Sequence, residues 1–199
     1  MRKIAILILM LLLTLSTNAQ LALKVGLDAN AAMGSTYWSG GPGVDAGLKY
    51  FISKHFDVGF SSGFQHFFPT SRWGDGYKDQ GINLVPLRFS IDYYFGEKKF
   101  KPYVGLELGP NLVELQYTYS YEYYDAYEDE YYSEYEKNDA SKTQFGAAPI
   151  LGFYINFGNS KVGADISARY NFISAPSGSD NRRKLNNAAV YAGLVFKFW

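Results

Sequence analysis

The 199-residue chain contains no cysteine. This absence excludes disulfide bonds, a catalytic thiol, thiolate metal sites and a lipid anchor on an N-terminal cysteine. Basic and acidic residues are equal in number, with 19 of each, so the chain lacks the basic excess of nucleic-acid-binding proteins. We therefore predict no nucleic-acid partner.

Long hydrophobic runs are also scarce, and the one at the N-terminus is short. After two basic residues, residues 4–13 are all apolar, and small side chains follow at residues 17–19. A helix needs about 20 apolar residues to cross a bilayer, so a membrane anchor, the alternative interpretation, fits poorly. We predict that residues 1–19 are a cleavable signal peptide and that residues 20–199 form one exported domain.

The chain is rich in aromatic residues and glycine, and its apolar residues alternate with polar or small ones. It has 18 Tyr, 15 Phe and 20 Gly, a composition that favours strands. Alternation with a period of two indicates a strand that has one apolar face. Eight segments show it, at residues 21–32, 43–52, 56–68, 83–95, 101–119, 143–157, 161–173 and 187–199.

The connections between these segments are long and short in turn. The long ones are residues 34–42, 69–81, 120–142 and 174–186, and the short ones are residues 53–55, 96–99 and 158–160. Long outer loops and short periplasmic turns are typical of transmembrane barrels. The predicted fold is therefore all-β, an eight-stranded antiparallel up-and-down transmembrane β-barrel. An even strand count places both termini on the periplasmic side.

The alternation breaks once, within residues 101–119. Large apolar residues occupy even-numbered positions up to Leu112 and odd-numbered positions from Val113. One extra residue in the strand would produce this shift, and proline, which lacks an amide hydrogen, fits such a place. We predict a β-bulge near Pro110.

The face opposite the large apolar residues carries glycine, small residues and charges of both signs. Eight strands enclose a space only wide enough for side chains, so we expect these charges to pair inside the barrel as a plug. The predicted lumen network is Lys24, Asp28, Asp45, Lys49, Asp57, Arg88, Asp92, Glu107, Asp165, Arg169 and Lys197. A soluble lipocalin-like barrel, the alternative, would turn its apolar face inward and its charged face outward.

Aromatic residues gather near the ends of the predicted strands, as in the two interfacial girdles of membrane barrels. The predicted girdle on the side of the short turns is Tyr50, Phe56, Tyr93, Phe95, Tyr103, Phe157 and Phe198. On the side of the long loops it is Trp38, Phe68, Tyr117, Phe145 and Phe172.

The last segment carries the pattern Tyr191-x-Gly193-x-x-Phe196-x-Phe198, with Trp199 one residue beyond it. It resembles the signal that the barrel-assembly machinery reads on the last strand of small eight-stranded outer-membrane β-barrels of Gram-negative bacteria, the OmpA-like and porin-family barrels. Residues 85–95 and 102–110 resemble paired strands of the Bacteroidota branch. The resemblance spans residues 20–199. It implies an outer-membrane location, contact with membrane lipids and lipopolysaccharide, and the assembly machinery as a partner.

The longest predicted loop, residues 120–142, has an unusual composition. Between Tyr117 and Asp139 there are nine tyrosines, eight acidic residues and a single base, Lys137. Tyrosine provides a large contact area at low entropic cost, so the loop is a candidate surface for an extracellular protein, a glycan or a cationic partner. The candidate residues are Tyr121, Tyr123, Tyr124, Tyr127, Tyr131 and Tyr132. A solvated, variable loop is the alternative interpretation.

Three functions follow from these features. The first is a structural and surface-interaction barrel, and the alternative is a small porin or lateral-diffusion transporter. A lipid-A-modifying enzyme, as in some barrels of the family that the chain resembles, is the third. It is disfavoured because Ser62 lies about 13 Å along the strand from His66, beyond proton-transfer distance. We predict no enzymatic activity, no cofactor and no metal site.

Overall fold

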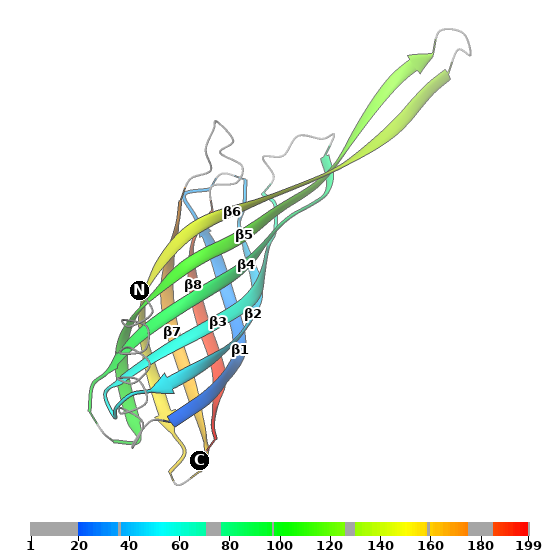
Figure 1. The fold of residues 1–199 in the computed structure, drawn as a ribbon. Helices are drawn as coiled ribbons and strands as arrows, with labels where there is room; N and C mark the ends of the chain where they lie inside the picture. Colours follow the sequence, from blue (N-terminus) through cyan, green and yellow to red (C-terminus); the bar gives the residue numbers. More distant parts are fainter. Residues whose placement is uncertain are drawn as a thin grey trace, which may run out of the picture.

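The computed structural model describes residues 20–35, 37–70, 77–96, 98–125, 130–158, 160–174 and 185–198. Their strands form one closed antiparallel barrel in chain order (Figure 1), which confirms the predicted eight-stranded up-and-down fold. The strands are β1 (Gln20–Met33), β2 (Gly40–Phe51), β3 (Phe56–Phe67), β4 (Tyr77–Tyr94), β5 (Phe100–Asp125), β6 (Glu130–Asn156), β7 (Val162–Ile173) and β8 (Asn186–Lys197). The predicted signal peptide lies outside the described residues. Within the described ranges, no helix is long and apolar enough to cross a membrane.

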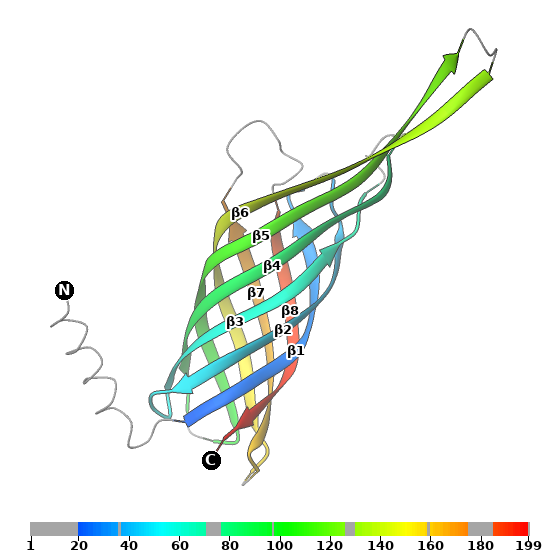
Figure 2. The ribbon, with the colours of Figure 1, turned by 45° about the vertical axis from the view of Figure 1, so that its right-hand side comes forward.

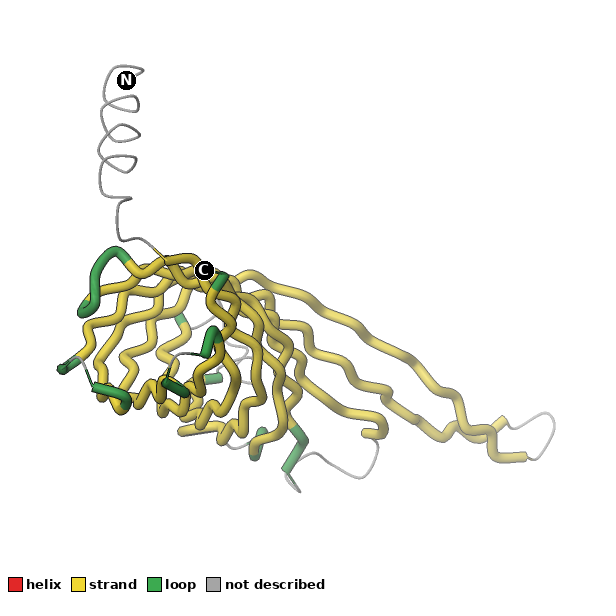
Figure 3. The backbone as a smooth tube through the Cα atoms, turned by 90° about the horizontal axis from the view of Figure 1, so that it is seen from below, coloured by secondary structure: helices red, strands yellow, loops and turns green. Residues whose placement is uncertain are grey.

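The barrel closes where β1 pairs with β8, from Ala22↔Lys197 to Met33↔Asn186. The start of β1 and the end of β8 therefore lie together, at the end of the barrel that carries the short connections. We call this end the turn end, and Figure 3 looks along the barrel from it. The opposite end is called the hairpin end.

The outer face of the barrel is a continuous apolar belt, because alternate residues of each strand point away from the lumen. Along the closed ladder most backbone groups pair between neighbouring strands, as a hydrocarbon environment requires. The exposed belt includes Val25, Leu27, Val44, Leu48, Phe60, Phe64, Phe89, Ile91, Leu106, Leu108, Leu151, Phe153, Ile166, Val190 and Leu194. The apolar face thus points outward, which contradicts the soluble-barrel alternative.

The predicted bulge near Pro110 is wrong. The β5–β6 pairing continues without a shift through Pro110↔Phe145, and β4 pairs with β5 in the same register on both sides of this proline. Leu112 is 45% exposed and Val113 only 1%, so the strand keeps its alternation. The apolar positions change parity because the lumen itself becomes apolar towards the hairpin end.

Most of the predicted loop 120–142 is strand, which corrects the sequence-based boundary. β5 continues to Asp125, β6 begins at Glu130, and the ladder reaches the pair Asp125↔Glu130. Figure 2 shows this two-stranded ribbon projecting far beyond the rest of the barrel. β4 also begins at Tyr77, inside the predicted loop 69–81. The tyrosine-rich alternation in this region therefore belongs to strands.

The aromatic girdles need two corrections. Trp38 and Tyr103, both predicted on the outer face, are each 1% exposed and lie inside the barrel. The side chain of Tyr117 lies outside the described residues. Exposed aromatic rings do remain at both ends of the belt, at Tyr93, Phe95, Phe157 and Phe198 and at Phe68, Phe145 and Phe172.

Candidate functional site

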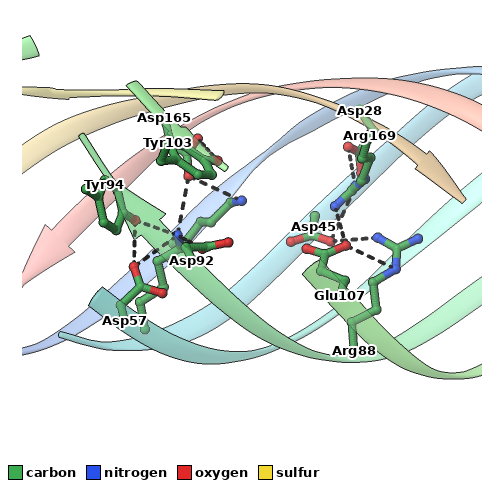
Figure 4. A network of polar contacts seen from close by, with 12 residues as sticks. Asp28, Asp45, Asp57, Arg88, Asp92, Tyr94, Tyr103, Glu107, Asp165 and Arg169 are labelled. Carbon is green, nitrogen blue, oxygen red and sulfur yellow. Dashed lines mark hydrogen bonds and ion pairs between the residues drawn. The ribbon is translucent and has the colours of Figure 1, made fainter. Parts of the chain in front are cut away.

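The lumen of the barrel contains two groups of buried charges at different depths, which lie at the left and the right of Figure 4. In the group nearer the turn end, Lys49 is the central cation. Its Nζ lies 2.6 Å from Asp92 Oδ2 and 3.3 Å from Asp57 Oδ2. Tyr94 accepts a hydrogen bond from Lys49 Nζ at 3.0 Å and donates its own proton to Asp57 Oδ2 at 2.5 Å. One ammonium thus bridges two neighbouring carboxylates.

A second ammonium completes this group. Lys24 Nζ lies 3.3 Å from Asp165 Oδ2 and 3.8 Å from the centre of the Tyr191 ring. Tyr103 donates a hydrogen bond of 2.8 Å to the other oxygen of Asp165. Phenol groups therefore supply hydrogen bonds that the two lysines alone do not provide.

The group nearer the hairpin end is built on two guanidinium groups. Arg169 Nη2 lies 2.5 Å from Asp28 Oδ1 and 3.7 Å from Asp45 Oδ2, and its Nη1 lies 3.4 Å from Glu107 Oε2. Arg88 contacts two of these three carboxylates, Glu107 at 3.6 Å and Asp45 at 3.7 Å. Planar guanidinium groups suit this role because each can contact several carboxylates at once.

Ten of the eleven predicted network residues are buried in these two groups. They comprise four cations and six carboxylates, so the formal charge of the assembled network is −2. The eleventh, Lys197, lies at the mouth of the turn end and makes no ion pair among the described residues. The alternation of β8 puts Lys197 on the same face as the network residues. Alternation shows the face on which a residue lies, but not how far along the lumen its side chain lies.

Two apolar layers, which the sequence analysis did not identify, seal the charges from both ends. At the hairpin end the cap consists of Trp38, Phe67, Ile82, Leu84, Val113, Leu115, Ile173 and Leu185. At the turn end the floor consists of Ala22, Tyr94, Tyr103, Ile150, Tyr154 and Val195, with Phe51 packed against it. The shift of apolar parity at Val113 was the sequence signal for the cap, and it was misinterpreted as a bulge.

A layer of amide side chains separates the upper charges from the cap. Asn171 donates a hydrogen bond of 2.6 Å to Asn187, and Asn111 donates one of 3.4 Å to the Gln144 carbonyl. The two cavities lined by the network residues are each about 10 Å³. That is room for about one water molecule. Among the described residues, no group of three or more acidic or histidine side chains is placed to hold a metal ion.

The predicted assembly signal occupies both faces of β8. Phe196 and Phe198 are exposed on the outer face, whereas Tyr191 is fully buried. A Cβ atom at Gly193 would collide with the Tyr191 hydroxyl, and one at Gly26 would lie 2.6 Å from its ring. The Tyr-x-Gly spacing therefore serves packing within the lumen.

The β5–β6 ladder gives the register of five of the six candidate tyrosines in the projecting hairpin. The ladder pairs Tyr121 with Glu134, Tyr123 with Tyr132 and Tyr124 with Tyr131. Tyr127 lies outside the described residues, as do Arg182, Arg183 and Lys184 of the last long loop. β4 stops pairing with β5 at Tyr119, and β7 first pairs with β6 at Gly146.

His66, the residue considered for an enzyme site, lies on the outer face near the hairpin end. Its Nδ1 is 2.8 Å from Asn83 Oδ1, and Asn83 Nδ2 is 3.4 Å from Glu114 Oε2. Its ring packs edge-on against Phe68 at a centroid distance of 5.1 Å. The described partner of this histidine is an amide.

Comparison with known proteins gives a consistent picture of the fold. No family model matches the chain, and a search of curated proteins found no match. Among solved structures, Neisserial surface protein A is similar with a TM-score of 0.57 and 16% identity over 90% of this chain and 97% of that one. A major outer membrane protein from Thermus thermophilus is similar with a TM-score of 0.57 and 11% identity, over 88% and 99%. Ail of Yersinia pestis, crystallised with the heparin analogue sucrose octasulfate, has a TM-score of 0.52 and 12% identity, over 90% and 97%. The chain thus has the fold of small outer-membrane β-barrels.

Proposed function

We propose that this protein is an integral outer-membrane barrel of a Gram-negative bacterium, with a surface-interaction role carried by the β5–β6 hairpin. A membrane location is supported by the apolar belt, by the fold of the similar structures and by the predicted signal peptide at residues 1–19. Lipids and lipopolysaccharide surround the belt, and the assembly machinery recognises β8 through Tyr191, Gly193, Phe196 and Phe198. Both termini are periplasmic, so the hairpin faces the outside of the cell.

The observation that carries this proposal is the length of the hairpin. Beyond Tyr119 the β5–β6 ladder continues for six more pairs, to Asp125↔Glu130, without a neighbouring strand on either side among the described residues. A barrel that served only as a membrane spacer would gain nothing from it. The ribbon extends beyond the rest of the barrel, where a partner can reach it.

The composition of the hairpin indicates the chemistry of its partner. Eight acidic residues and one lysine between Tyr117 and Asp139 give this segment a strong negative charge. Such a surface attracts cationic partners and repels polyanions, while its nine tyrosines supply contact area. The partner is therefore a cationic protein or peptide segment. A sulfated glycan of the kind bound by Ail would meet like charge here.

The test compares three forms of the mature protein refolded in zwitterionic nanodiscs, with polylysine as the probe. The first is unaltered, and the second has residues 120–135 replaced by an Asn-Gly turn. In the third, the eight acidic residues between Tyr117 and Asp139 are changed to their amides. Unaltered protein should bind polylysine in a salt-dependent manner. The amide variant should bind at least about tenfold more weakly, because its charge is gone.

The deletion variant should lose the binding and keep its heat-dependent shift in gel mobility, since the barrel ladder below Tyr119 is untouched. Equal polylysine binding by the unaltered and deleted forms would contradict a surface role for the hairpin. Loss of the mobility shift would instead mean that the hairpin is needed for folding.

A small porin or transporter remains the second candidate function, because six carboxylates and four cations line the lumen. The apolar cap, the aromatic floor and the small internal cavities support a plugged lumen instead. The arrangement around His66 gives no support to a lipid-A-modifying enzyme, since its described partner is Asn83.

A further inference from the structure

The projecting hairpin leaves one long strand edge without a neighbour among the described residues (Figure 2). On the side of β6 that faces β7, pairing ends with the hydrogen bond of 2.8 Å from the Ser174 amide to the Phe145 carbonyl. Lys142 and Gln144 make further contacts just beyond this point. Past them, no described strand lies on this side of residues 130–141, and we call these residues the open edge.

The pairing shows which backbone groups of the open edge point away from β5. In an antiparallel ladder the N–H and C=O of one residue point to the same side, and successive residues alternate. The Asn156 amide donates to the Lys99 carbonyl on the β5 side, whereas the Phe145 carbonyl accepts on the β7 side. The register with β5 continues without a shift to Glu130. Odd-numbered residues therefore present their backbone groups at the open edge: Tyr131, Ser133, Tyr135, Lys137, Asp139 and Ser141.

The open edge lacks the features that commonly block strand edges. Native proteins protect unpaired edges with proline, with bulges or with a covering segment. Residues 130–141 contain neither proline nor glycine, and their register with β5 has no bulge. Such an edge is a template for one more strand, whose main-chain groups would extend the ladder.

The charge of the open edge decides between a second copy of the chain and a different partner. Residues 130–141 contain one base, Lys137, against four acidic residues, Glu130, Glu134, Glu136 and Asp139. The same edge of a second copy would bring the same net negative charge, and like charges across a strand pair are destabilising. A basic strand would instead meet opposite charge along the edge.

We propose that the open edge of β6 binds an extended, basic segment of a partner protein by strand addition. This inference rests on the proposed surface role of the hairpin and adds the binding mode to it. Backbone pairing supplies affinity along the edge, and the acidic residues select lysine or arginine on the added strand. Strand addition needs main-chain donors on both partners, which attraction between charges alone does not.

The test uses a peptide of alternating lysine and threonine, about ten residues long, and the mature barrel in zwitterionic nanodiscs. A matched peptide has every backbone nitrogen methylated, so it keeps the charges and loses its main-chain donors. The protein variant is Ser133→Pro/Ser141→Pro, because proline at these positions removes edge-facing amides and spares those that bond to β5. The control, Ser133→Ala/Ser141→Ala, keeps both amides and the same charge.

Two measurements are made on each pair, the affinity by fluorescence anisotropy and the exchange of backbone amide hydrogens by NMR. In the protein alone, the edge-facing amides of Ser133 and Lys137 should exchange faster than the amide of Tyr132, which faces β5. Bound peptide should slow the exchange of the edge-facing amides about tenfold or more. Protection of the Tyr132 amide and the heat-dependent mobility shift confirm that ladder and barrel are intact. If the proline variant loses this ladder, the methylated peptide decides, because it leaves the protein unaltered.

Strand addition predicts that methylation of the peptide and the proline variant each weaken binding about tenfold or more, and that the alanine control does not. Equal binding of both peptides, with polylysine binding retained, would overturn strand addition and leave the surface role intact. Binding of neither the peptide nor polylysine would overturn both proposals.

Edge-facing amides that are protected before any peptide is added would also overturn strand addition by a partner. Protection that grows with protein concentration would identify a second copy as the occupant of the edge. Protection independent of concentration would identify a segment of the same chain.

Discussion

Tyr191 illustrates how single residues fill a narrow barrel. Its ring covers two glycines that face each other where β1 pairs with β8, Gly26 and Gly193. The Lys24 ammonium lies 3.8 Å from the centre of the ring. Tyr103 covers Gly152 in the same way, because a Cβ there would lie 2.6 Å from the phenol ring. At Gly26, Gly152 and Gly193 the absence of a side chain therefore leaves space that an aromatic ring from a nearby position occupies.

This packing predicts the effect of Gly193→Ala. The added methyl group would displace the Tyr191 ring, and overpacking of this kind costs about 1–3 kcal/mol. We expect the urea midpoint of the refolded barrel to fall accordingly, with folding followed by the heat-dependent mobility shift. Refolding in vitro separates this effect from recognition by the assembly machinery.

The matched control is the same change in a Tyr191→Ala background. With the ring gone, the part of the cost that comes from the tyrosine should disappear, whereas the contact of the methyl group with the Val25 carbonyl oxygen, at 2.5 Å, should remain. An equal loss of stability in both backgrounds would show that the glycine matters for the backbone of β8 and not for the tyrosine.

The buried ion pairs differ from the packing of Tyr191 in what they contribute to stability. Breaking a buried ion pair by removing one partner commonly costs about 3–5 kcal/mol, whereas the intact pair adds little net stability. Arg169 contacts three carboxylates, Asp28, Asp45 and Glu107. These pairs are best understood as the means by which polar side chains fill the lumen with each buried charge close to an opposite one.

At the scale of elements, strand number, order and closure were predictable from the sequence. Alternation in each segment divided its residues between two faces, and the lengths of the connections indicated the topology. Two features could not be predicted from the alternation, and both for one reason: it does not show what lies next to each face of a strand. A period of two shows that Val113 and Leu115 share a face, but it does not say whether that face lies inside or outside. Similarly, the alternating tyrosines from Tyr117 to Tyr123 fit strand and loop alike when their partner strand is unknown.

Single cysteines decide the parity of β5 directly, because the chain has no cysteine of its own. In the proposed membrane orientation, Leu112→Cys faces lipid and should react with a lipid-soluble maleimide. Val113→Cys lies in the apolar cap and should react only after unfolding. Labelling is measured by mass spectrometry of the barrel in nanodiscs.

Leu108→Cys is the reference, since it faces outward with or without a bulge near Pro110. It should react as Leu112→Cys does. The reverse pattern, with position 113 labelled and position 112 protected, would restore the bulge and move the cap residues of β5 to the outer face.

At the scale of the whole molecule, the two ends of the barrel differ in charge and shape. The hairpin end carries a two-stranded ribbon with an acidic sequence, and three lysines, Lys54, Lys101 and Lys197, line the mouth of the turn end. Between them the lumen passes from aromatic floor through two charged groups and an amide layer to an apolar cap. This layering separates the two ends of the lumen from each other.

The sealed lumen predicts that the folded barrel does not conduct. The network cavities of about 10 Å³ hold about one water molecule each, and ions need a continuous hydrated path. We expect no single-channel steps in planar bilayers from unaltered protein whose mobility shift confirms closure. Arg88→Ala should also be silent, because it opens space only between the two seals.

The double change Trp38→Ala/Leu115→Ala removes bulk from the cap itself and is the variant in which steps should first appear, if the floor is the weaker barrier. Discrete, salt-dependent steps from the unaltered barrel would contradict the sealed lumen and make transport of small solutes the leading function.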